Sequence, residues 1–173
     1  LTVLDGPAGA SPKLAFGYNL DGDAGWETLT RLGDDQCPMY GGQKLDASGH
    51  WFSPEDTGHG FSAQILPNTE IYAAYVYDGD GFPRWLIGQK DYDASVTSVT
   101  MQLLTGFCPT CPLVPLQSRS VGTLTRTLGA SSGNDGRPGI TSLDLGVAYE
   151  PRFWGAFFAD APTFLLSERK GCD

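Results

Sequence analysis

The sequence has few positive charges, few histidines and no long apolar run. Its 173 residues include 11 Lys and Arg against 20 Asp and Glu, which gives a formal net charge of −9 at pH 7. Nucleic acids and anionic membranes bind through clustered Lys and Arg, so this balance argues against both as partners. No stretch approaches the roughly 18 consecutive apolar residues of a membrane-spanning helix. We therefore expect no nucleic-acid partner and no membrane insertion, which leaves proteins, neutral ligands and divalent cations.

Helical periodicity is also missing, because no stretch repeats apolar residues at the spacing of three and four that a helix requires. Alternation with a period of two is present instead, for example at Phe61, Ala63 and Ile65, and 23 Gly and 12 Pro supply turns. This pattern predicts an all-β fold, an antiparallel meander of roughly ten short strands that closes into a barrel or a sandwich. We expect residues 1–12 to be an extended leader or linker and residues 13–173 to form a single β-domain.

The sequence lacks a P-loop and a Gly-x-Gly-x-x-Gly dinucleotide motif. Acidic residues are frequent in the expected turns, and two of them facing one another across a cleft would serve glycoside hydrolysis. The candidates are Glu55, Asp56, Asp78, Asp80, Asp91 and Asp93, and nothing in the sequence singles out a pair. A small secreted hydrolase that uses paired carboxylates is therefore an alternative function, against the simpler interpretation of solvated turn residues.

The four cysteines are Cys37, Cys108, Cys111 and Cys172, which allow three pairings if all are oxidised. We favour Cys108–Cys111 and Cys37–Cys172, because neighbouring thiols close easily and the other two would tie the C-terminal tail to an early loop. A redox Cys-x-x-Cys needs a helix N-terminus, which the surrounding prolines oppose. Disulfides would place the chain outside the cytosol, in an extracellular, cell-surface or periplasmic location.

The run Asp78-Gly79-Asp80-Gly81 predicts a β-hairpin turn. Calcium prefers several oxygen ligands at close spacing, and acidic turns of extracellular proteins provide them. The turn forms equally well without a metal. We therefore expect no cofactor, with calcium at Asp78 and Asp80 as the one candidate that the sequence leaves open.

Aromatic residues make up 12% of the chain, more than a core of this size requires. Successive residues of a strand point to opposite faces, so Tyr72 and Tyr75 cannot both point inward. Some rings must lie on an outer face, where they cover a second layer, stack on a ligand or form a subunit interface. The residues that we predict for ligand binding or an interface are Trp51, Tyr75, Tyr77, Trp85 and Trp154.

Residues 49–88 carry the pattern G-x-W-x-x-P-x-x-x-G-x-G-F, then an apolar strand, then Y-x-Y-D-x-x-G-x-P-x-W-L. This pattern resembles a β-rich accessory module of secreted and surface proteins of proteobacteria. Residues 121–125 and 166–169 are similar to its weaker second half, and residues 49–128 form the core of the signature. The resemblance implies an extracytoplasmic β-domain, and it carries over no activity and no catalytic residue.

Together these features predict a non-enzymatic extracellular binding or assembly module that acts through exposed aromatic strands. Its expected partner is a protein, through self-association or in a parent assembly, or a carbohydrate. Besides the hydrolase, the second alternative is a lipocalin-like protein that binds a small ligand inside its barrel.

Overall fold

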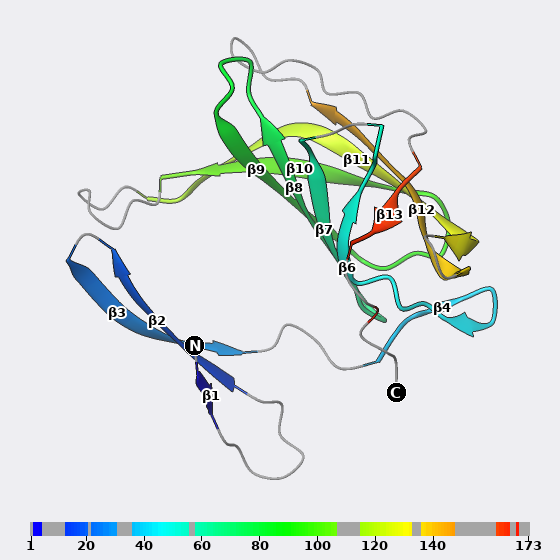
Figure 1. Ribbon diagram of the computed structural model, residues 1–173, viewed down its shortest axis with the longest axis horizontal. Helices are drawn as coiled ribbons and strands as arrows, with labels where there is room; N and C mark the ends of the chain where they lie inside the picture. Colours follow the sequence, from blue (N-terminus) through cyan, green and yellow to red (C-terminus); the bar gives the residue numbers. More distant parts are fainter. Residues whose placement is uncertain are drawn as a thin grey trace. The chain divides into compact units, whose positions relative to one another are not determined.

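The computed structural model describes residues 2–4, 13–20, 22–30, 36–55, 58–106, 115–132, 136–147, 162–166 and 169. Every regular element among them is a strand, so the predicted all-β fold is confirmed (Figure 1). The chain divides into two compact units, where the sequence predicted one domain from residue 13 onward. The first comprises residues 1–35 and 105–117, and the second comprises residues 36–104 and 118–173.

The second unit contains an antiparallel sheet of eight strands in the order β12-β11-β10-β9-β8-β7-β6-β13. Consecutive strands are neighbours from β6 to β12, so the predicted meander is confirmed, and the sheet curls until it is nearly closed into a barrel (Figure 1). The strands are β6 (Gly49–Phe52), β7 (Gly60–Ile65), β8 (Glu70–Tyr77), β9 (Pro83–Lys90), β10 (Thr97–Thr105), β11 (Gln117–Ser132), β12 (Arg137–Val147) and β13 (Phe164–Leu165).

A short segment joins the two edges of this sheet. Pro162 forms an antiparallel bridge with Ser142 of β12, and the N–H of Thr163 donates to the carbonyl of Thr141 at 3.3 Å. The next two residues form β13, which pairs with β6. Open strand edges invite pairing with other chains, and this segment covers part of both edges.

The core lies on the inner face of the curled sheet. Side chains of β7 and β8 alternate between buried and more exposed positions, as the period of two predicts. Leu45 and Ala47, which precede β6, are also fully buried. The largest fully buried hydrophobic side chains are Trp51, Tyr72, Leu45, Ile65, Leu86, Met101, Leu124, Ile140, Leu143 and Leu145.

Two glycine-containing turns differ in how well the sequence predicted them. Tyr77 pairs with Pro83, so residues 78–82 form the loop of the β8–β9 hairpin that the Asp-Gly run predicts. Gly81 has a φ of 82°, a conformation that glycine adopts without strain. The early loop that we expected around Cys37 contains, before β6, a small hairpin of β4 (Met39–Tyr40) and β5 (Gln43–Lys44).

The first unit contains a three-stranded sheet in the order β1-β2-β3, with β1 (Thr2–Leu4), β2 (Lys13–Leu20) and β3 (Asp23–Thr30). Strand β1 lies in the predicted leader and pairs with β2. The ring of Trp26 covers Gly17, where a Cβ atom would come within 2.7 Å of it. Across the described part of the chain, no helix has the length and apolarity needed to cross a membrane.

Candidate binding surface

The outward-facing positions of β7, β8, β9 and β10 carry no charged side chain, although the chain has 31 charged residues (11 Lys and Arg plus 20 Asp and Glu). Each of these positions alternates along its strand with a buried or partly buried one, and cross-strand partners face the same way. We call this surface the neutral wall. It comprises Ser62, Gln64, Ile71, Ala73, Tyr75, Tyr77, Pro83, Trp85, Ile87, Gln89, Ser98, Thr100, Gln102 and Leu104.

Aromatic rings gather at the end of the neutral wall that is nearest the β8–β9 turn. Tyr75 and Trp85 are direct cross-strand partners, and their rings meet edge to face with centroids 6.2 Å apart at 77°. Trp85 nevertheless remains 72% exposed. Tyr77 is 45% exposed and packs edge to face against the ring of His59. Phe82, in the turn itself, is also exposed. Three of the predicted aromatic residues therefore lie together on one surface.

Trp51 occupies a different place from these three rings. It lies at an inward-facing position of β6, is fully buried, and its Nε1 donates to the carbonyl of Ala47 at 2.9 Å. Its ring therefore belongs to the core, which corrects its placement among the displayed aromatics. The sequence predicts that neighbouring residues of β6 face opposite sides of the sheet. It does not predict which of these residues faces the core. Trp154 lies outside the described residues.

The carboxylate of Asp78 is engaged by the hairpin itself. Its Oδ1 accepts the N–H groups of Asp80 at 3.1 Å and Phe82 at 2.9 Å, and its Oδ2 lies 2.7 Å from a guanidinium nitrogen of Arg84. Burial would raise the pKa of Asp78, but the two N–H donors and Arg84 outweigh it and hold this pKa below its ordinary value. A calcium ion at Asp78 would have to displace Arg84.

In the part of the chain that the structure describes, no group of three His, Cys, Asp or Glu residues could hold a metal ion. Asp78 and Asp80 therefore stay a calcium prediction that rests on the sequence alone. The hydrogen bonds that Asp78 accepts from Asp80 and Phe82 fix the loop that precedes β9. They thereby help to position Trp85, which lies on that strand.

The depressed pKa of Asp78 predicts a pH-dependent effect of Asp78→Asn. The carboxylate stabilises the folded chain fully above its unfolded pKa of about 4, and this stabilisation is lost as the pH falls through the lower folded pKa. Thermal unfolding followed by circular dichroism should show the largest deficit of the variant near pH 7 and a progressively smaller deficit as the pH falls below about 4. Asp80→Asn removes the same charge from the same turn. An equal pH dependence for both variants would contradict this assignment.

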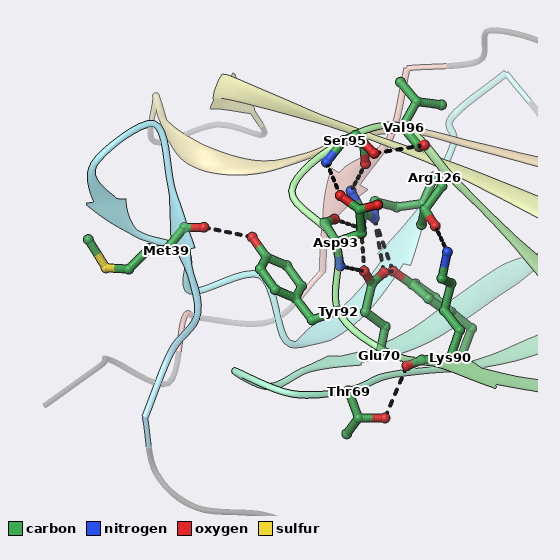
Figure 2. Close-up of polar contacts among 11 residues, drawn as sticks. Met39, Thr69, Glu70, Lys90, Tyr92, Asp93, Ser95, Val96 and Arg126 are labelled. Carbon is green, nitrogen blue, oxygen red and sulfur yellow. Dashed lines mark hydrogen bonds and ion pairs between the residues drawn. The ribbon is translucent and has the colours of Figure 1, made fainter.

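A second cluster, which the sequence did not reveal, lies inside the barrel (Figure 2). Glu70 of β8 and Arg126 of β11 are both fully buried and form an ion pair. The Nε of Arg126 donates to Oε2 of Glu70 at 3.1 Å and to the hydroxyl of Tyr72 at 3.3 Å. That hydroxyl donates to Oε2 of Glu70 at 2.6 Å. Two strands that are not neighbours are thus joined through the core.

The same cluster holds the turn between β9 and β10. Arg126 donates to the carbonyls of Asp93 at 2.6 Å and Ser95 at 2.9 Å, and the N–H of Asp93 donates to Glu70 at 3.0 Å. Tyr92, in the same turn, reaches the carbonyl of Met39 at 2.8 Å (Figure 2). The cluster therefore fixes one end of the barrel.

The titration behaviour of the cluster argues against acid–base chemistry there. Burial raises the pKa of Tyr72 far above its ordinary value, and the adjacent Glu70 carboxylate raises it further. Burial opposes the charge of Arg126, but the hydrogen bonds and charge of Glu70 outweigh it and raise the pKa of the guanidinium. Both groups keep their protons throughout the physiological range. The cluster is best explained as a structural tie.

The letters Gly-x-Ser-x-Gly occur at residues 129–133, a pattern typical of hydrolase nucleophiles. In those enzymes the serine lies on a sharp turn between a strand and a helix. Here Ser131 lies within β11, and Gly129 pairs with Gly139 of β12. The letters therefore do not form a nucleophile elbow.

Among the described residues Cys37 is the one cysteine, so no disulfide joins two of them. Cys37 itself is disulfide-bonded. Cys108, Cys111 and Cys172 lie outside the described residues, and the pairings Cys37–Cys172 and Cys108–Cys111 stay predictions.

No family model, no curated protein and no solved structure matches this chain.

Proposed function

We propose that this chain is a non-enzymatic binding module that docks another polypeptide against the neutral wall. The observation that supports it is the combination of exposed Tyr75, Tyr77 and Trp85 with a complete lack of charge on the surrounding outward positions. Centres of protein interfaces are depleted in charged residues and enriched in Tyr, Trp and Phe. Energetic hot spots are enriched in Trp and Tyr as well.

The shape of the patch favours a polypeptide over a carbohydrate. A sugar ring stacks on the open face of an aromatic ring, and several sugars in a row require several rings lying flat. Tyr75 and Trp85 meet edge to face at 77°, so they do not form one flat platform. Their neighbours Ile87 and Leu104 are exposed aliphatic side chains that offer sugar hydroxyls no hydrogen bond. Aliphatic and aromatic side chains of a protein partner would cover all four.

An extracytoplasmic location is part of this proposal. The resemblance of residues 49–88 to a module of secreted proteins supports it, and so does the disulfide at Cys37, because disulfides persist in oxidising compartments.

A photo-crosslinking residue tests the position of the docking surface. The probe is p-benzoylphenylalanine, placed at Ile87 on the neutral wall or at the control Leu166, which is exposed beyond β13. After irradiation in an extract of the source cells, we expect protein adducts from position 87 and none from position 166. Equal adducts at both positions, or none at position 87, would contradict the proposal.

Trp85→Ser should weaken binding of the partner identified in this way by about 30-fold, the effect of losing a hot-spot residue worth about 2 kcal/mol. Isothermal titration calorimetry with the purified partner measures this loss, and Leu166→Ser is the matched control on the other surface. A glycan array provides a separate check. If the wild-type chain binds a glycan and Trp85→Ser abolishes that binding, the partner is a carbohydrate and the proposal of a polypeptide partner is wrong.

A further inference from the structure

We infer that the polypeptide that occupies the neutral wall is a second copy of this chain. The inference rests on the proposed function and names its partner. It is carried by the contrast between the charge of the whole chain and the charge of this surface. The chain carries a formal charge of −9, whereas the outward positions of β7 to β10 carry none.

Charge distinguishes a second copy from a different partner. Two copies repel each other because each is strongly acidic, and like charges placed face to face oppose association. The neutral wall is a surface on which two copies meet without opposing charges. An acidic chain attracts a different partner most readily when its own acidic residues face a basic surface of that partner. The wall carries no acidic residue that could do so.

The wall has one end with aromatic side chains and one end without them. Large rings of Tyr75, Tyr77 and Trp85 stand at the end near the β8–β9 turn, whereas Ile71, Gln89 and Thr100 occupy the opposite end. Two sheets pack face to face with their strands nearly aligned. A twofold axis that lies between the sheets and runs across the strands brings the aromatic end of each copy over the non-aromatic end of the other.

This axis passes at the level of Ile87, which pairs with Ala73 on one side and Gln102 on the other. The level of Ile87 is midway between the two ends of the wall. Ile87 of one copy therefore lies opposite Ile87 of the other. A charge introduced at this position would face the identical charge in the second copy.

The size of the wall sets the expected strength. Four strands about 4.8 Å apart and eight residues long cover roughly 20 Å by 25 Å, or about 500 Å² for each copy. The outer face of a curled sheet is convex, so two copies together bury at most about 1,000 Å², which is near the lower limit of specific interfaces (Figure 1). We therefore expect a reversible dimer with a dissociation constant on the order of tens of micromolar.

Sedimentation velocity of the full chain over about 1–500 µM tests the inference, at low and high sodium chloride. We expect a monomer–dimer equilibrium that strengthens with salt, because salt screens the repulsion between two acidic copies. Association driven by complementary charges would weaken instead. A chain that stays monomeric at the highest concentration, or a dimer that salt dissociates, would overturn the inference.

Ile87→Glu provides the mutational test, with Leu166→Glu as the control that adds the same charge at an exposed leucine elsewhere. Ile87→Glu should raise the dissociation constant at least tenfold, and Leu166→Glu should change it less than twofold. Unchanged melting temperatures verify that both variants fold. Equal effects of the two substitutions would overturn the inference.

The outcome separates this inference from the proposed function. If the chain is monomeric and position 87 crosslinks to a different protein, the partner is not a second copy, but the proposal that the neutral wall docks a polypeptide is retained. If the chain is monomeric and position 87 yields no adduct, both are wrong.

Discussion

Arg126→Met should lower the free energy of unfolding by about 3–5 kcal/mol, because it leaves the carboxylate of Glu70 buried without its counter-charge. The substitution also removes the donors that hold the carbonyls of Asp93 and Ser95. Methionine replaces the aliphatic stem of arginine but not the guanidinium, so a small cavity adds to the electrostatic loss.

Urea unfolding at pH 7, followed by far-ultraviolet circular dichroism, measures this loss. Arg84→Met is the matched control, since it removes the ion pair with Asp78, in which the Arg84 side chain is 40% exposed and the Asp78 carboxylate keeps two N–H donors. Ion pairs near solvent contribute little to stability, so the loss for Arg84→Met should be a small fraction of that for Arg126→Met. Equal losses would show that the buried pair has no special role.

Removing both charges should recover much of the stability that Arg126→Met loses. Glu70→Leu combined with Arg126→Met no longer buries an unpaired charge, and hydrophobic replacement of a buried ion pair is often neutral. The recovery is incomplete because the hydroxyl of Tyr72 then has neither partner. A double variant that is less stable than Arg126→Met would contradict this account.

The sequence predicted the strands from β7 to β10 well because two independent signals agree there. Apolar residues alternate along each strand, and Gly, Pro and Asp mark the turns between them. Agreement between local turn chemistry and the hydrophobic pattern is what specifies a meander. The division into two units had no such signal, since residues 105–117 belong with the N-terminal strands and not with their neighbours in sequence.

The ion pair in the core went unrecognised because charged residues are expected at the surface. A signal existed in each strand, as Glu70 shares its face with Tyr72 and Ala74, and Arg126 shares its face with Leu124 and Leu128. An opposite charge at a core position of each of two strands indicates a buried pair. Their meeting depends on the curvature of the sheet, which alternation does not specify.

Strand β8 departs from the usual arrangement of side chains at each of its ends. Its charged residue, Glu70, points into the barrel, and the rings of Tyr75 and Tyr77 point out. The inward charge is compensated by Arg126, but nothing on β8 compensates the exposure of the rings. An exposed apolar surface of this kind usually marks an interaction site. The same strand thus contributes to both the tie inside the barrel and the proposed docking surface outside it.

Gly122→Ala and Gly146→Ala should change stability in opposite directions, although the two glycines lie one pair apart on adjacent strands. A Cβ at Gly122 would fall 2.1 Å from the carbonyl oxygen of Gly146 and 3.0 Å from Cα of Val147. These are backbone atoms, so β12 itself must move away from β11. We expect Gly122→Ala to lower the free energy of unfolding by about 3 kcal/mol.

A Cβ at Gly146 meets no atom within 4 Å. Gly146→Ala therefore costs no packing, and it restricts the unfolded chain, so it should stabilise the protein by about 0.5 kcal/mol. Urea unfolding of both variants at one pH measures the two effects with the same change of a single methyl group. Similar losses for both would show that alanine is disfavoured in this hairpin for a general reason. A tolerated Gly122→Ala would show that β11 and β12 are not held as close together as the structure places them.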